Sequence, residues 1–163
     1  GRHRFPHALH RRHTCNVAVR GDAMRDACTD RCVGRRSQPP RYRPDLAARA
    51  PLHAVLGNND DGLEARLPVE EHLDLDGVRV TLVHDSGPAA GRPGRMKRRY
   101  PESDVVIFGH SHLPLDEEGA EGQRLFNPGS CTERRRAPHR TYGLLVIDGG
   151  ALIDHQVVAL PRP

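Results

Sequence analysis

Short polar segments follow apolar, strand-like runs in this chain, and their histidine and asparagine side chains could bind a metal ion. Gly109-His110-Ser111-His112 follows the apolar run at 105–108, with its two imidazoles two residues apart. Residues two apart point the same way in extended backbone, so this pair predicts a metal anchor at the mouth of a buried strand. We expect Gly109 to let the chain leave the strand in an unusual conformation, and Pro114 to delay the next regular element.

Three more polar segments stand at strand-like ends. Ligand sites in open α/β sheets collect at the carboxyl ends of strands, because loops from separate strands converge there. Each segment alone is explained by a turn, since Asn and Asp favour turns, but together they favour a metal site. The segments are Gly57-Asn58-Asn59-Asp60 after 52–56, His84-Asp85 after 79–83, and Asn127-Pro128-Gly129-Ser130 after 124–126.

The elements that must position these segments alternate with turns from about residue 45 onward. Asp76-Gly77 predicts a hairpin, because this pair tolerates the positive φ of such turns, and Gly149-Gly150 predicts a second one. The basic segment 92–100 predicts an exposed helix, and 45–50 predicts the end of another before Pro51. The expected strands are 52–56, 71–75, 79–83, 104–108, 124–126, 141–147 and 151–160.

Length and composition predict a cytoplasmic protein. The 163 residues suit one domain, and with only 4% aromatic residues the core must be aliphatic. No apolar run approaches the roughly 18 to 20 residues that cross a bilayer, and no apolar N-terminal segment of signal-peptide form is present, so we expect no membrane partner. The four cysteines lack the spacing of a disulfide scaffold, and we expect reduced thiols.

Residues 1–44 differ from the rest, and we predict that they are an atypical basic segment preceding a domain at 45–163. Residues 1–50 hold 12 basic and 4 acidic residues, whereas the remainder holds 13 and 17. Only 17–19 resembles a strand. Three explanations stay open: a disordered solvated arm, an arm that binds nucleic acid or an acidic partner, and a misread segment from a shifted reading frame. We do not expect nucleic-acid binding, because aromatic residues and a recognisable motif are missing.

The ordered set G-N-x-D, a strand-end His, G-H-[ST]-H-x-P and N-P-G-S resembles the calcineurin-like metallophosphoesterase superfamily, in particular its small YfcE-like phosphodiesterases. The resemblance covers roughly residues 45–160. It implies an α/β fold in which two β-sheets form a sandwich flanked by helices, with two divalent metal ions at the strand ends. It also implies that Asn58, His84 and His110 bind the second ion, and that His112 binds the first.

The function implied by this resemblance is that of a hydrolase. A metal-activated hydroxide would attack the phosphorus of a phosphoester, with Asn58, Asp60 and His84 as the catalytic residues. Imidazole and oxygen ligands suit Mn, which we take as the working assumption, with Zn, Fe, Co or Ni as alternatives. The expected substrate is a small or nucleotide-like phosphoester, and a homo-oligomer is left open.

The chain departs from the family pattern at the first metal position. Relatives begin with Asp-x-His, which is absent here. Asp22 is the candidate bridging ligand, with Asp26 as an alternative. We therefore expect low activity, and the alternative function is a catalytically weak or inactive protein-binding scaffold of the same fold. A nucleic-acid binder with a vestigial site is the third.

Two other positions bear on the chemistry. Many relatives have His where Asn59 stands, and Asn cannot supply a titrating proton to the leaving group, which removes help worth roughly 10²- to 10⁴-fold. Asp60 could instead orient a metal ligand, or cap the segment that follows. The run Arg134–Arg136 is expected to be a solvated face, although arginine also binds phosphate well.

Overall fold

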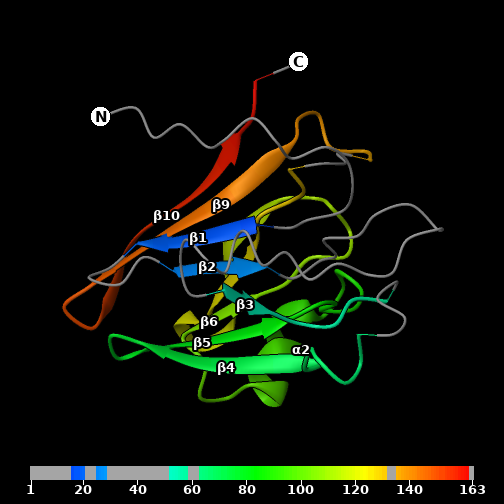
Figure 1. Cartoon of the computed structure of the whole chain (residues 1–163). Helices are drawn as coiled ribbons and strands as arrows, with labels where there is room; N and C mark the ends of the chain where they lie inside the picture. The colour runs from blue at the N-terminus through cyan, green and yellow to red at the C-terminus, as the bar shows by residue number, and fades with distance from the viewer. Residues whose placement is uncertain (1–15, 21–24, 29–51, 59–62, 132–134, 162–163) are drawn as a thin grey trace.

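The computed structural model describes residues 16–20, 25–28, 52–58, 63–131 and 135–161. These residues form two five-stranded sheets, one α-helix and one short 3-10 helix. Figure 1 shows the sheets one above the other. In spatial order the first sheet contains β10 (Ala151–Ala159), β9 (Thr141–Asp148), β1 (Asn16–Arg20), β2 (Arg25–Cys28) and β3 (Leu52–Ala54). The second contains β4 (Glu70–Leu75), β5 (Val78–Val83), β6 (Val105–Ile107), β8 (Arg124–Asn127) and β7 (Leu115–Glu118).

Three strands at the centre of the second sheet run parallel, which brings their carboxyl ends to one edge. β5 pairs with β6, and β6 with β8, so that Leu82, Ile107 and Phe126 lie side by side. β4 and β7 close the two sides of this sheet as antiparallel neighbours. The histidine and asparagine segments therefore leave adjacent strands in the same direction.

The second sheet is buried on both faces. Val80, Leu82 and Ile107 belong to a core cluster that also contains Leu145 and Ile147 of the first sheet, so this cluster fills the space between the sheets. A separate cluster packs the other face against the helix α2 (Arg92–Arg99), which lies behind β4 and β5 in Figure 1. The second cluster contains Val83, Met96, Tyr100, Val106, Phe108 and Leu125.

Helix α2 occupies the predicted basic segment. Gly91 with φ 67° precedes it, and Pro93 stands in its first turn, where the missing N–H costs no helical hydrogen bond. Lys97, Arg98 and Arg99 occupy the last turn, where positive charge is favourable to the helix dipole. The expectation of an exposed helix is only partly right, because Met96 is buried against the sheet.

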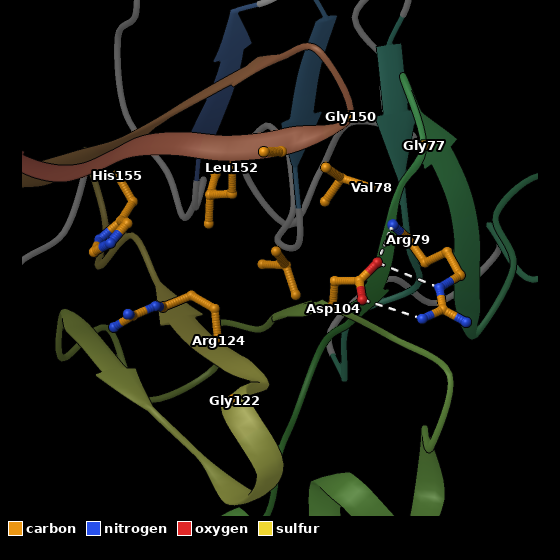
Figure 2. Close-up of a pocket in the computed structure, with 11 residues that line it drawn as sticks. Gly77, Val78, Arg79, Asp104, Gly122, Arg124, Gly150, Leu152 and His155 are labelled. Atoms are coloured by element: carbon orange, nitrogen blue, oxygen red, sulfur yellow. Dashed lines mark hydrogen bonds and ion pairs between the residues drawn. The ribbon is translucent and has the colours of Figure 1, made fainter.

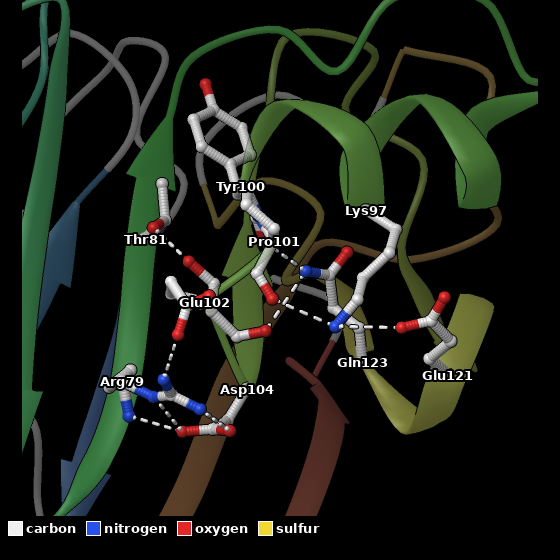
Figure 3. A network of polar contacts seen from close by, with 10 residues as sticks. Arg79, Thr81, Lys97, Tyr100, Pro101, Glu102, Asp104, Glu121 and Gln123 are labelled. Carbon is white, nitrogen blue, oxygen red and sulfur yellow. Dashed lines mark hydrogen bonds and ion pairs between the residues drawn. The ribbon is translucent and has the colours of Figure 1, made fainter.

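A polar network ties the end of α2 to the amino ends of β5 and β6 (Figure 3). Gln123, which follows the 3-10 helix η1 (Ala120–Gly122), donates from Nε2 to the carbonyls of Tyr100 and Ser103, at 2.8 and 3.0 Å. The Gln123 side chain is almost completely buried. These bonds satisfy two carbonyls in a turn that lacks regular pairing.

The predicted strands and the α/β sandwich are confirmed in the described residues. Each strand from β3 to β6 and from β8 to β10 starts and ends within two residues of its predicted bounds. Asp76 and Gly77 adopt positive φ in the predicted hairpin, at 53° and 83°. No helix in this part of the chain is long and apolar enough to cross a membrane. The expected helix end at 45–50 lies outside the described residues.

Two strands, β7 and β2, differ from expectation. β7 begins at Leu115, so Pro114 does not delay the next element, because proline is tolerated just before an edge strand. β2 was not predicted, and β1 contains the strand-like run 17–19. Both lie in the first sheet between β9 and β3. The domain boundary after residue 44 stays a prediction.

Candidate metal centre

Loops from three strands meet around the imidazole of His84, which directly follows β5. Its Nε2 lies 2.9 Å from Oδ1 of Asn58, in the segment after β3. The same Nε2 lies 3.0 Å from Nδ1 of His110, in the loop after β6. The two imidazole rings meet edge to face, with centroids 5.0 Å apart. The structure thus brings together three of the residues predicted as metal ligands.

The three atoms that converge are all electron-pair donors suited to a divalent ion. The asparagine oxygen carries no proton, and each neutral imidazole has one nitrogen with a free lone pair. Ligand bonds of about 2.1 Å at right angles place neighbouring donor atoms about 3.0 Å apart, which matches the two distances around His84. Two imidazoles and an amide oxygen therefore fit Mn²⁺ in both chemistry and spacing, and they fit Zn²⁺ in chemistry.

The loop after β6 has a backbone that the sequence did not predict. His110 and His112 adopt positive φ, at 62° and 59°, whereas Gly109 is not among the described glycines with positive φ. The expectation of an extended pair pointing one way, with Gly109 in the unusual conformation, is therefore wrong. The loop is instead closed locally, because Ser111 N–H donates to the Gly109 carbonyl at 2.7 Å.

Hydrogen bonds hold this loop against its neighbours. Gly109 N–H donates to the His84 carbonyl at 3.0 Å, which joins the loops after β5 and β6. Asn127, whose side chain is completely buried, donates from Nδ2 to the Gly109 carbonyl at 3.1 Å and to Ser111 Oγ at 3.2 Å. Its Oδ1 accepts from Gly129 N–H at 2.9 Å. Asn127 therefore positions the histidine loop.

Sequence reasoning placed Asn127 in a polar strand-end loop but gave it no role. The signal that could have found it is an asparagine that ends a buried strand and precedes Pro-Gly. Gly129 has φ 75°, and a Cβ there would overlap Oγ1 of Thr141. Thr141 in turn donates to the Pro128 carbonyl at 2.7 Å. Only glycine, which has no side chain, therefore fits at position 129 of this turn.

His112 is almost completely buried, with 1% of its surface exposed. Within the described residues no three histidine, cysteine or acidic side chains lie close enough together to hold a metal ion, so His112 completes no such group with His84 and His110. Asp22, Asp60 and Asn59 lie outside the described residues, and Asp26 is described only in its backbone as part of β2. The roles assigned to them stay predictions, as does the ligand role of His112.

A polar hollow of about 510 Å³ lies at the amino ends of β5, β6 and β8, away from His84 and His110. Figure 2 shows His155 and Arg124 on one side of it and Arg79 with Asp104 on the other. Hydrogen bonds from Arg79 hold the pKa of Asp104 below its usual range. Asp116 accepts from both Arg124 and His155. These charges pair with one another, and no predicted site residue lines the hollow.

The two-sheet architecture agrees with the comparison to known families. The family model of the calcineurin-like phosphoesterase superfamily domain matches residues 11–150. The chain belongs to this superfamily. The match includes β1 and β2 as well as the histidine segments, and it confirms the resemblance seen in the ordered motifs.

Individual known proteins resemble a shorter part of the sequence or the fold alone. Phosphodiesterase YfcE of Escherichia coli K12 is 36% identical over 61 residues, which is 36% of this chain and 33% of the relative's length. Vps29 from Cryptosporidium parvum has a TM-score of 0.60 at 14% identity, covering 93% of this chain and 100% of that one. Wild-type Vps29 from Entamoeba histolytica, solved in complex with Zn²⁺, has a TM-score of 0.56 at 18% identity, covering 89% and 98%. At these identities the structures establish the fold only.

Proposed function

We propose that this chain is a metal-dependent phosphoesterase that hydrolyses phosphodiesters, with Mn²⁺ as its working metal. The observation that carries the proposal is the convergence of Asn58 Oδ1, His84 Nε2 and His110 Nδ1 at the carboxyl edge of the sheets. Membership of the superfamily and the local identity to phosphodiesterase YfcE support it.

Some residues of this chain would bind the ion, and others hold the ion's ligands in position. Asn58, His84 and His110 would bind one divalent ion. Such an ion supplies positive charge for the phosphoryl oxygens and lowers the pKa of an attacking water. His84 is 7% exposed, so its imidazole has little freedom to turn away from the site. Asn127 holds the loop that carries His110.

The substrate is expected to have a good leaving group. Asn59 carries an amide and cannot protonate a leaving oxygen. The rate of hydrolysis should therefore be lowered least for activated or diester substrates whose leaving groups need no proton. Small and nucleotide-like phosphodiesters fit this requirement. Turnover is expected to be slow, because the sequence lacks the Asp-x-His of relatives.

The test compares Mn²⁺ binding by the wild-type chain and by His110→Ala. Removing one of three ligands should weaken Mn²⁺ binding by more than about 100-fold, since even partners that only orient a ligand change affinity about 10- to 100-fold. His155→Ala is the matched control, because it removes a histidine that bonds to Asp116 and lines the hollow at the amino ends of the strands. Titration calorimetry measures both affinities.

Hydrolysis of an aryl phosphodiester is measured on the same proteins. The wild type and His155→Ala should show slow, Mn²⁺-dependent hydrolysis that His110→Ala loses. Unchanged Mn²⁺ affinity in His110→Ala would overturn the metal assignment. A wild type that binds Mn²⁺ and hydrolyses no phosphoester would be a binding protein of the same fold, and the enzymatic proposal would then be wrong.

A further inference from the structure

Arg135 lies beside the candidate metal centre although it belongs to a different loop. It comes eight residues after the end of β8 in the sequence. Its Nη1 donates to the backbone carbonyl of His110 at 3.1 Å. The imidazole of the same histidine faces His84. One hydrogen bond therefore places a guanidinium next to the backbone that carries a candidate ligand.

The backbone at Arg135 shares an unusual feature with that loop. Its φ is 47°, in the left-handed region that costs side chains other than glycine roughly 1 kcal/mol or more. Three of the five described non-glycine residues with positive φ lie in the loops after β6 and β8, and they are His110, His112 and Arg135. Strained residues of this kind gather where geometry serves a site. Arg135 thus shares its left-handed backbone conformation with the loop that carries His110 and His112.

The guanidinium of Arg135 has more N–H donors than its hydrogen bond to His110 uses. Arginine carries five N–H groups, and the bond to His110 uses one of them. By contrast, Arg79 pairs with Asp104, and Arg95 donates to three backbone carbonyls. Arg135 is exposed and forms no ion pair with a described carboxylate. Its remaining N–H groups bond to no described residue, so they are available to a ligand beside the site.

We infer that Arg135 binds a non-bridging phosphoryl oxygen of the substrate, an inference that rests on the proposed phosphoesterase function. Phosphate oxygens accept from a guanidinium in a planar, two-pronged geometry, which lysine cannot reproduce. The bond to His110 fixes the guanidinium before the substrate arrives, so less side-chain entropy is lost on binding. Arg135 is thus a substrate-binding residue.

The test measures binding of inorganic phosphate to the Mn²⁺-loaded chain by titration calorimetry. Arg135→Met should weaken phosphate binding about tenfold or more, the effect of losing one hydrogen bond between charged groups. Arg135→Lys should recover only part of the loss, because it keeps the charge without the fork. Arg136→Met is the matched control, since Arg136 is exposed and bonds to no described residue of the site.

Three further readouts separate binding from structure. All variants should keep the wild-type Mn²⁺ affinity, and Arg135→Met should raise KM for an aryl phosphodiester more than it lowers kcat. Equal losses of phosphate affinity in Arg135→Met and Arg136→Met would mean that the loss of any nearby positive charge weakens binding. That result would overturn the inference. Weaker Mn²⁺ binding in Arg135→Met would overturn it in favour of a structural role. A wild type that binds no Mn²⁺ would overturn the proposed function and this inference together.

Discussion

Replacing Asn127 by leucine tests whether the loop after β6 depends on this side chain. Leucine has the same branched arrangement of heavy atoms, although it is bulkier, and it removes the donors to Gly109 and Ser111 and the acceptor for Gly129. Each such bond contributes about 1 kcal/mol net. Asn127 is completely buried, so water cannot replace the lost partners. We expect the free energy of unfolding to fall by about 3 kcal/mol.

The effect on metal binding is the sharper part of this prediction. Gly109 and Ser111 flank His110, so a loop without its bonds to Asn127 samples conformations in which Nδ1 of His110 leaves His84. Partners that orient metal ligands change metal affinity about 10- to 100-fold, and we expect a loss of Mn²⁺ affinity in this range. Titration calorimetry measures it at a temperature where urea denaturation shows the variant to be folded.

Gln123→Leu is the matched control. Gln123 is another buried amide whose two hydrogen bonds go to Tyr100 and Ser103, away from the histidines. Its Oε1 has no hydrogen-bond partner, so leucine also removes a buried unsatisfied oxygen, and the destabilisation should be only about 1 kcal/mol. Mn²⁺ affinity should stay within about twofold of wild type. Equal losses of metal affinity in both variants would refute the positioning role of Asn127.

Two further predictions concern packing and pH. Gly143→Ala should lower the free energy of unfolding by about 1 to 3 kcal/mol in urea denaturation, because its Cβ would overlap the buried ring of Phe126. Gly94→Ala in α2 should not, because its nearest neighbour is the flexible end of Arg98. Asp104→Asn should cost less than about 1 kcal/mol at pH 7, since the pair with Arg79 is partly exposed. Folding lowers the pKa of Asp104, so its carboxylate stabilises the fold above pH ~4, and the difference from wild type should shrink as the pH falls below that value.

The strands and the grouping of polar loops could be predicted because their signals are local. Alternation predicts strands such as β4 and β5, and Asp76-Gly77 predicts the turn between them. β7 was missed because Leu115–Glu118 contains three acidic residues, which are typical of an exposed edge rather than of a strand core. β2 was missed for a similar reason, since Arg25–Cys28 carries two charges and its pairing with β1 is a tertiary contact.

The geometry of the site could not be predicted from spacing, because it depends on backbone conformation. Residues two apart share a face only while the chain is extended. At His110 and His112 the left-handed backbone turns the chain, so the two imidazoles need not point the same way. His110 faces His84, whereas His112 is buried and completes no three-residue group of histidine, cysteine or acidic side chains within the described residues. The motif H-x-H therefore marks the loop in which His110 meets His84, but hydrogen bonds from Asn127 and from the neighbouring loop decide how that loop is placed.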